Sequence, residues 1–249
     1  ISNPSSPTLT STYNTSGSAR GVTVSGNYAF VADYYSGLEI IDISNPYVPT
    51  LIGTYSTLGE VYDVSISGNY AFIVEELGDL KIININNPNF PQQVGAHTYN
   101  GLPSGVSVSG NYAYVVGYNG LEIIDIYNPS SPTLTGTYNT SAGDVIVSGN
   151  YAYVVGINGL EIIDISNPSL PTLSGTFNNG SSVSDVSLSG NYAYLSSYSS
   201  GLEIIDISNP SSPALIGTYN TPGDAYGISV SGNYAFVADW IEGLQIIDI

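Results

Sequence analysis

The side chains that could carry chemistry in this sequence are one histidine and an excess of carboxylates. The chain has 20 Asp and Glu, one His, two strong cations, and no Cys or Met. Thiol nucleophiles and thiolate metal sites are therefore excluded. The chain has no Gly-x-Ser-x-Gly motif that would supply a nucleophile for His97. When the repeats of the chain are aligned, His97 falls at a position that is aromatic in the other copies. We therefore expect a structural histidine, and we predict no catalytic residue and no cofactor.

Nearly all of the carboxylates recur at fixed places in a repeat. We use the word column for the residues at one aligned position of the repeats. The column of Asp42 precedes a Ser-Asn-Pro turn, where a carboxylate can accept hydrogen bonds from turn amides. The column of Glu39 is expected at solvated outer positions. Asp63, Asp144 and Asp185 begin a strand that is expected to be innermost. There we expect repeated capping, with a calcium site built from oxygen ligands as the weaker alternative.

The repeat is the strongest signal in the chain. Gly-Asn-Tyr occurs six times at spacings of 39 to 42 residues, between an alternating stretch and an aromatic stretch. Each copy is followed by a Leu-x-Ile-Ile-x-Ile stretch, an Asn-Pro segment and a further strand-like stretch. We name these four predicted strands A to D. Gly-Asn favours a tight A–B hairpin, and the prolines of the C–D link cannot continue a ladder.

Four-stranded units of about forty residues are typical of propeller blades. The sequence therefore predicts a single all-β domain over residues 1–249, a six-bladed β-propeller with four antiparallel strands per blade and almost no helix. A strand D at residues 8–14 should pair with strand C at 244–249, so that the N-terminal segment completes the last blade and closes the ring. The predicted blades are residues 20–58, 61–100, 104–140, 143–179, 184–221, and 226–249 with 1–15.

The string Leu-Glu-Ile-Ile-Asp-Ile-Ser-Asn-Pro at 38–46, with copies near 121, 160 and 202, resembles the LVIVD-repeat propellers of bacterial and archaeal surface or secreted proteins. The resemblance covers the whole chain. It implies the propeller fold and a secreted or cell-surface location, and it implies no reaction. The second repeat departs from the pattern with Lys81 and Asn84, and the last repeat has Gln245, so neither acid of the string is obligatory.

The charge of the chain limits its partners. A net charge of −18 repels phosphate backbones and anionic membrane surfaces. No apolar stretch approaches the roughly 18 residues of a membrane helix. We therefore expect no nucleic acid partner, no membrane insertion and a monomer.

The least repetitive segments are the D–A and B–C loops, which the chain direction places at one common face. Variable loops on a rigid scaffold are where binding usually resides, and Tyr and Trp suit interfaces. We predict a non-catalytic scaffold or binding module that takes a protein or glycan on this face. One alternative is a calcium-dependent hydrolase or lactonase, and another is a purely structural or engineered repeat protein. The candidate binding residues are Arg20, Asp33, Tyr34, Tyr35, Tyr118, Tyr198, Asp239 and Trp240.

Overall fold

The computed structural model describes residue 4 and residues 6–249. The chain divides into two compact units. We call residues 8–136 the first unit, and residues 137–249 with 1–7 the second unit. The boundary falls inside strand β12. Each unit is described by itself.

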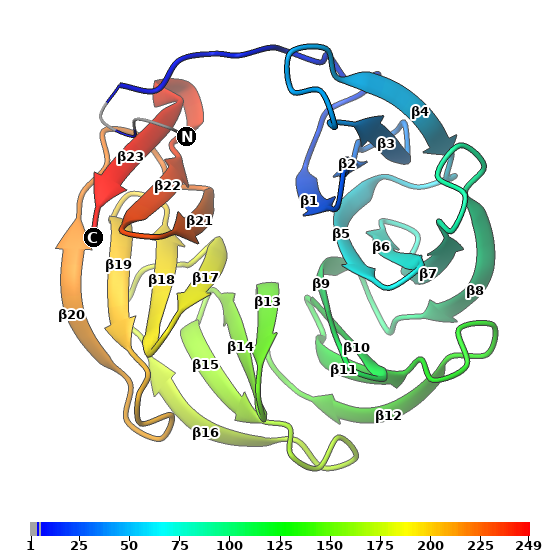
Figure 1. The fold of residues 1–249 in the computed structure, drawn as a ribbon. Coiled ribbons are helices and arrows are strands. Elements are labelled where there is room, and N and C mark those ends of the chain that lie inside the picture. The colour runs from blue at the N-terminus through cyan, green and yellow to red at the C-terminus, as the bar shows by residue number, and fades with distance from the viewer. Residues whose placement is uncertain (1–3, 5) are drawn as a thin grey trace. The chain divides into compact units, whose positions relative to one another are not determined.

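The first unit contains three antiparallel sheets, which we call blades 1 to 3. In each sheet the strands pair in chain order, as the coloured strands of Figure 1 show. The strands are β1 Gly21–Ser25, β2 Tyr28–Ala32, β3 Leu38–Asp42, β4 Thr50–Tyr55, β5 Val61–Ser67, β6 Tyr70–Glu75, β7 Asp79–Asn84, β8 Gln92–Thr98, β9 Pro103–Ser109, β10 Tyr112–Gly117, β11 Gly120–Asp125 and β12 Thr133–Tyr138.

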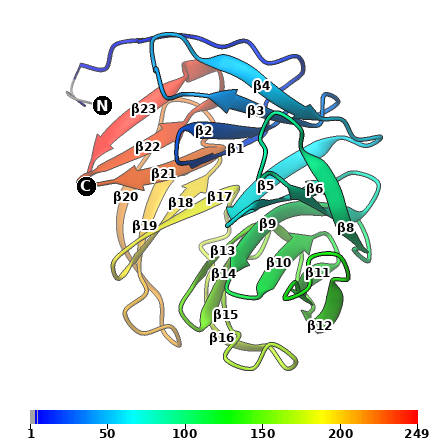
Figure 2. The same cartoon turned by 45° about the vertical axis from the view of Figure 1, so that its right-hand side comes forward.

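The second unit contains blades 4 to 6, and the turned view of Figure 2 shows the same meander in them. One 3-10 turn, η1 Trp240–Glu242, precedes the last strand. No helix in the described residues is long and apolar enough to cross a membrane. The strands are β13 Ala142–Ser148, β14 Tyr151–Gly156, β15 Gly159–Asp164, β16 Thr172–Phe177, β17 Asp185–Ser189, β18 Tyr192–Ser197, β19 Gly201–Asp206, β20 Ala214–Tyr219, β21 Gly227–Ser231, β22 Tyr234–Ala238 and β23 Leu244–Asp248.

Blade 6 differs from the others because its sheet has three strands, β21, β22 and β23. The sequence predicts a fourth strand at residues 8–14. Residues 7–15 carry no strand assignment in the described part of the chain. An extended segment is a strand only where its amides and carbonyls join a ladder, and this ladder is not formed in the structure.

The A–B turns follow the prediction from Gly-Asn. Gly26 has a φ of 59°, and the glycines of the other five copies have nearly the same value. Glycine adopts a positive φ without a steric penalty, which favours it at the first central residue of these two-residue hairpins. At the other link, Asp42 accepts a hydrogen bond from the Ser44 amide (2.8 Å), and Asn45 accepts one from the Tyr47 amide (3.1 Å). The predicted role of the Asp42 column is confirmed.

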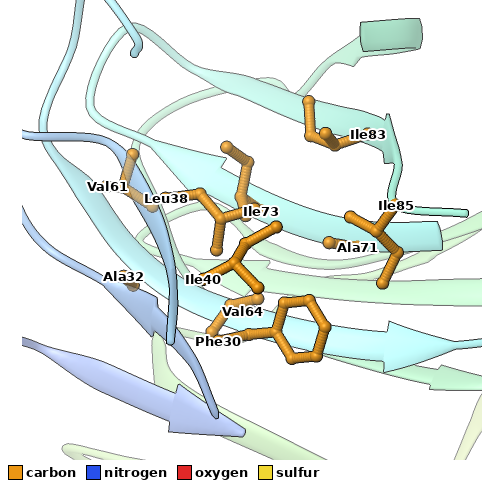
Figure 3. Packing of buried hydrophobic residues seen from close by; sticks show 10 residues of the cluster. All are labelled: Phe30, Ala32, Leu38, Ile40, Val61, Val64, Ala71, Ile73, Ile83 and Ile85. Carbon is orange, nitrogen blue, oxygen red and sulfur yellow. The ribbon is translucent and has the colours of Figure 1, made fainter. Parts of the chain in front are cut away.

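The hydrophobic core lies between neighbouring sheets. Figure 3 shows Phe30, Leu38 and Ile40 of blade 1 packed against Val64 and Ile73 of blade 2, in a cluster of buried residues. Similar clusters join blades 2 and 3, 4 and 5, and 5 and 6. Burial of a large apolar side chain contributes about 1.5–3 kcal/mol. In blades 2 and 5, strands B and C have apolar residues on both faces because a neighbouring sheet of the same unit packs against each face.

Candidate functional site

The meander places the B–C and D–A loops at one end of each sheet, and the A–B turns and C–D links at the other. We call these the loop end and the turn end. All eight predicted binding residues lie at the loop ends. Those of the first unit are Arg20, Asp33, Tyr34, Tyr35 and Tyr118, and those of the second unit are Tyr198, Asp239 and Trp240.

Three loop-end aromatic residues have an unusual backbone conformation. Tyr34, Tyr198 and Trp240 have φ angles of 51°, 28° and 41°, the only positive values at non-glycine residues in the described chain. Each occupies the same place in its B–C loop, and its carbonyl accepts a hydrogen bond from the following glycine. Such a conformation costs on the order of 1–3 kcal/mol and persists only when the surroundings impose it. The sequence identified these residues as variable loop aromatics, but it carried no sign of the strain.

Tyr34 is the centre of an aromatic cluster in the first unit. Its ring centroid lies 4.5 Å from that of Tyr35 and 6.1 Å from that of Tyr62, in edge-on arrangements. Arg20 Cζ lies 4.6 Å from the Tyr34 centroid, which is a cation–π distance. We call Arg20, Tyr34, Tyr35, Glu60 and Tyr62 the blade 1 cluster.

Glu60 joins the hydroxyls of the blade 1 cluster. Tyr62 Oη donates to Glu60 Oε2 over 3.1 Å. A hydrogen bond to Glu60 is the main cause that raises the pKa of Tyr35 to about 12. Desolvation alone would raise the pKa of Glu60, but the hydroxyls of the three tyrosines and the charge of Arg20 lower it overall. The carboxylate is therefore ionised at neutral pH, and the cluster balances its own charges.

The second unit has a related aromatic cluster without a cation. Tyr198 and Tyr226 have ring centroids 5.1 Å apart, and Tyr226 and Trp240 have centroids 6.1 Å apart, all edge-on. Trp240 is 64% exposed and Tyr226 is 44% exposed. We call these three residues the blade 5–6 cluster. Tyr226 was not among the predicted residues, because it lies at the end of a D–A loop whose direction the sequence does not show.

A cavity of about 720 Å³ opens beside Tyr198. It lies between the loop ends of blades 4 and 5, inside the second unit. None of the described residues that line it is charged. Its volume is within the range of small-ligand sites. The lining includes Ser141, Gly156, Ser181, Ser184, Ser197 and Tyr198.

Two predicted binding residues, Asp33 and Asp239, lie beneath the loops. Both are fully buried. Asp33 Oδ2 accepts a hydrogen bond from the Gly17 amide, and Asp239 Oδ2 accepts one from the Gly223 amide over 2.9 Å. They hold D–A loops in place and do not reach the surface that was predicted for them. Tyr118, by contrast, is 78% exposed and has no ring contact among the described residues.

The column of Glu39 was predicted to be solvated, and this prediction is wrong. Glu39, Glu122 and Glu203 are 1%, 7% and 2% exposed. Each of these carboxylates accepts hydrogen bonds from the D–A loop that precedes its own blade. Glu39 Oε1 binds the Ser16 amide (3.2 Å), Glu122 Oε1 binds the Asn100 amide (3.1 Å), Glu161 Oε2 binds Thr140 Oγ1, and Glu203 Oε1 binds Asn179 Nδ2.

His97 is part of this arrangement. It pairs with Leu80 of strand C, as its aromatic column does in other blades, and its Nε2 lies 2.9 Å from Glu122 Oε2. Lys81 replaces the glutamate in blade 2, and it forms an ion pair with the buried Glu75. The three side chains of the first unit that can carry positive charge therefore all have partners inside the chain.

The column of Asp63 joins neighbouring blades. Asp63 accepts hydrogen bonds from the amides of Val64 (2.8 Å) and of Val106 in the next blade (2.9 Å). Asp185 does the same with Val186 (2.6 Å) and Ile228 (2.8 Å). The expected capping role is thus extended to a link between strands A of successive blades. Among the described residues no three His, Cys, Asp or Glu side chains are grouped to hold a metal ion.

These sheets, their order and their repeat define the class of the protein as a six-bladed β-propeller. The LVIVD repeat matches the chain along its whole length, and the chain belongs to the LVIVD-repeat family. The matched segments are residues 1–15, 16–57, 58–98, 100–140, 141–179, 180–221 and 222–249. A comparison with curated proteins finds no match.

Solved structures share this fold at low sequence identity. A chain of a mitotic checkpoint complex is 16% identical with a TM-score of 0.81, covering 96% of this chain and 77% of that one. The propeller domain of Cps50 (Swd1) from Myceliophteria thermophila is 14% identical with a TM-score of 0.74, covering 93% and 82%. A functionally unknown protein from Desulfotomaculum acetoxidans is 15% identical with a TM-score of 0.71, covering 90% and 79%. At such identities the likeness concerns the fold alone.

Proposed function

We propose that this propeller is a non-catalytic binding module that takes a protein or glycan partner at its loop ends. The observation that carries the proposal is the contrast between the frame and the loops. The turn ends and the acid columns repeat from blade to blade, whereas Tyr34, Tyr198 and Trp240 occupy strained positions in only three of the six B–C loops. Strained residues are concentrated at functional sites, and aromatic side chains are enriched at interfaces.

The family resemblance supports a secreted or cell-surface location for the module, and this location belongs to the proposal. A net charge of −18 keeps nucleic acids and anionic membranes away, which favours a protein or neutral glycan as the partner. A monomer is expected.

The alternative of a calcium-dependent hydrolase depends on Asp63, Asp144 and Asp185. The oxygens of Asp63 and Asp185 already accept amide hydrogen bonds, so a calcium ion would compete with the links between blades. Melting with and without a chelator tests this alternative. A calcium-dependent rise in the melting temperature would favour it over the binding module.

The binding proposal is tested on arrays of proteins and glycans with the full chain. A variant carrying Tyr35→Ser, Tyr198→Asn and Trp240→Asn should lose the partner that the wild type captures. The matched control changes two exposed tyrosines at the turn ends, Tyr47→Ser and Tyr127→Ser, which are 74% and 80% exposed. Loss in the control but not in the loop variant would overturn the proposal, and a blank array would favour the purely structural alternative.

A further inference from the structure

Tyr34 in blade 1 and Tyr198 in blade 5 occupy equivalent places. Each forms an isolated bridge to the next blade, to Val61 and Ala225 respectively, with an amide-to-carbonyl distance of 3.0 Å in both. Each ring also meets the edge of a tyrosine from the next blade. The two rings therefore sit in the same local frame.

The residue beside the ring differs between the two places. In blade 1 the Arg20 amide donates to the Ala32 carbonyl over 2.8 Å, and in blade 5 the Ser184 amide donates to the Ser196 carbonyl over 2.8 Å. Arg20 and Ser184 are thus equivalent in register. The guanidinium of Arg20 lies over the Tyr34 ring, whereas Ser184 and Tyr198 both line the open cavity.

We propose that the cavity beside Tyr198 binds the guanidinium of an arginine side chain from a partner protein, over the Tyr198 ring as Arg20 lies over Tyr34. The inference rests on the proposed function and names the chemistry of its partner. Arginine stacks on aromatic rings, and such contacts are stronger where water is excluded. Ser184 supplies no guanidinium where Arg20 does in blade 1, and the cavity has room for one from outside.

The charges of the second unit favour a cation from outside. Residues 137–249 contain no Lys, Arg or His, although they carry Asp and Glu throughout. Asp224 precedes Ala225 as Glu60 precedes Val61, so an acid stands at the equivalent place in both frames. In blade 1 this acid lies near the guanidinium, and Arg20 helps to lower the pKa of Glu60. Serine hydroxyls and backbone carbonyls of the lining can accept the guanidinium N–H groups.

The test uses the full chain and three short capped peptides that differ in one central residue: arginine, lysine or citrulline. Binding is measured by isothermal titration calorimetry in about 0.15 M salt, where attraction to the general negative charge is screened beyond about 8 Å. The arginine peptide should bind saturably, more tightly than the lysine peptide and at least about fivefold more tightly than the neutral citrulline peptide. Equal binding of arginine and citrulline peptides would overturn the inference.

Two variants test whether the arginine peptide binds in the cavity. Ser184→Arg supplies an internal guanidinium and should abolish binding of the arginine peptide, while Ser212→Arg adds the same charge at an exposed turn-end position and should leave it intact. Tyr198→Asn removes the ring, and asparagine tolerates a positive φ, so this variant should fold and weaken binding about fivefold. Tyr127→Asn, at an 80% exposed turn-end tyrosine, is its control and should leave binding unchanged. Arginine binding that survives both Ser184→Arg and Tyr198→Asn would place the site elsewhere and refute the inference.

The two proposals fail separately in these experiments. A glycan or a partner without arginine that binds the wild type but not the Tyr198→Asn variant would keep the binding module and refute the arginine site. Absence of arginine-peptide binding refutes the arginine site directly.

Discussion

The loop ends of the two units use the same aromatic frame in opposite ways. In the first unit Arg20 covers the Tyr34 ring, Lys81 pairs with Glu75, and His97 contacts Glu122. The second unit has no Arg, Lys or His, and the space beside Tyr198 is a cavity. The same frame therefore holds a covered ring where an arginine precedes strand A and borders a cavity where a serine precedes it.

The largest effect is expected where the first unit's internal pairing is broken. Lys81→Glu would place a second carboxylate beside Glu75, which is fully buried, and should reduce the free energy of unfolding by about 3–5 kcal/mol. Glu75→Gly with Lys81→Glu recreates the residues of blade 4, Gly156 and Glu161. This double variant should recover most of the loss in urea unfolding. A Lys81→Glu protein as stable as the wild type would show that the pair has no structural role.

The next largest effect is expected in the second unit, which has no cationic side chain. There Glu203 stabilises a D–A loop through hydrogen bonds alone. Glu203→Ala leaves Asn179 Nδ2 and the buried Ser197 hydroxyl without their acceptor, so it should cost about 1–3 kcal/mol in urea unfolding. The matched control is Gln245→Ala, at the same register in blade 6, which should change stability by less than about 0.5 kcal/mol. Equal effects of the two changes would contradict the role of the buried glutamates.

A smaller effect, with the opposite sign, is expected at Asp144. Burial and the neighbouring Asp185 carboxylate raise its pKa well above the usual value. The folded state therefore holds this proton more tightly than the unfolded state, and the associated stability is present at low pH and lost as the pH rises through the raised pKa. Asp144→Asn should raise the melting temperature at pH 7 by roughly a few degrees. The difference in melting temperature between the variant and the wild type should disappear as the pH falls below the ordinary carboxyl range. A difference that stays constant with pH would refute this explanation.

The smallest effect should be the same in both units, because the turn ends are alike. Hydrogen bonds from the side chain and amide of the following serine lower the pKa of Asp42 in the first unit and of Asp164 in the second. This stability is present above the unfolded pKa and lost as the pH falls through the lowered one. Asp42→Ala and Asp164→Ala should therefore lower the melting temperature slightly and equally at pH 7, and the loss should shrink as the pH falls through the lowered pKa. Unequal losses would show that the turn ends differ between the units.

Much of the frame can be predicted from the sequence because its causes are local. The Gly-Asn turns, the proline links and the Asp42 column each depend on residues a few positions apart. The aromatic column of His97 follows from the register of the repeat.

The candidate site was predicted only in part. The sequence places Tyr34, Tyr198 and Trp240 at the loop ends, since loop position follows from strand order. It does not reveal the burial of Glu39, because the partner amide of Ser16 comes from a loop without regular structure. It assigns Asp33 and Asp239 to the surface, although each is needed beneath a loop as an acceptor.

The repeat of four-stranded units and the acidic, nearly cation-free composition follow from the amino-acid sequence alone. Only the folded structure brings the interacting side chains together: Arg20 over Tyr34 within blade 1, Ser184 and Tyr198 of blade 5 along one cavity, and Asp185 on the amide of Ile228 in the next blade. The two kinds of feature differ in whether the interacting residues are neighbours along the chain. Strands and turns depend on neighbours along the chain, whereas the cavity depends on packing between blades 4 and 5, and the cation–π contact depends on how the folded blade orients two loop side chains.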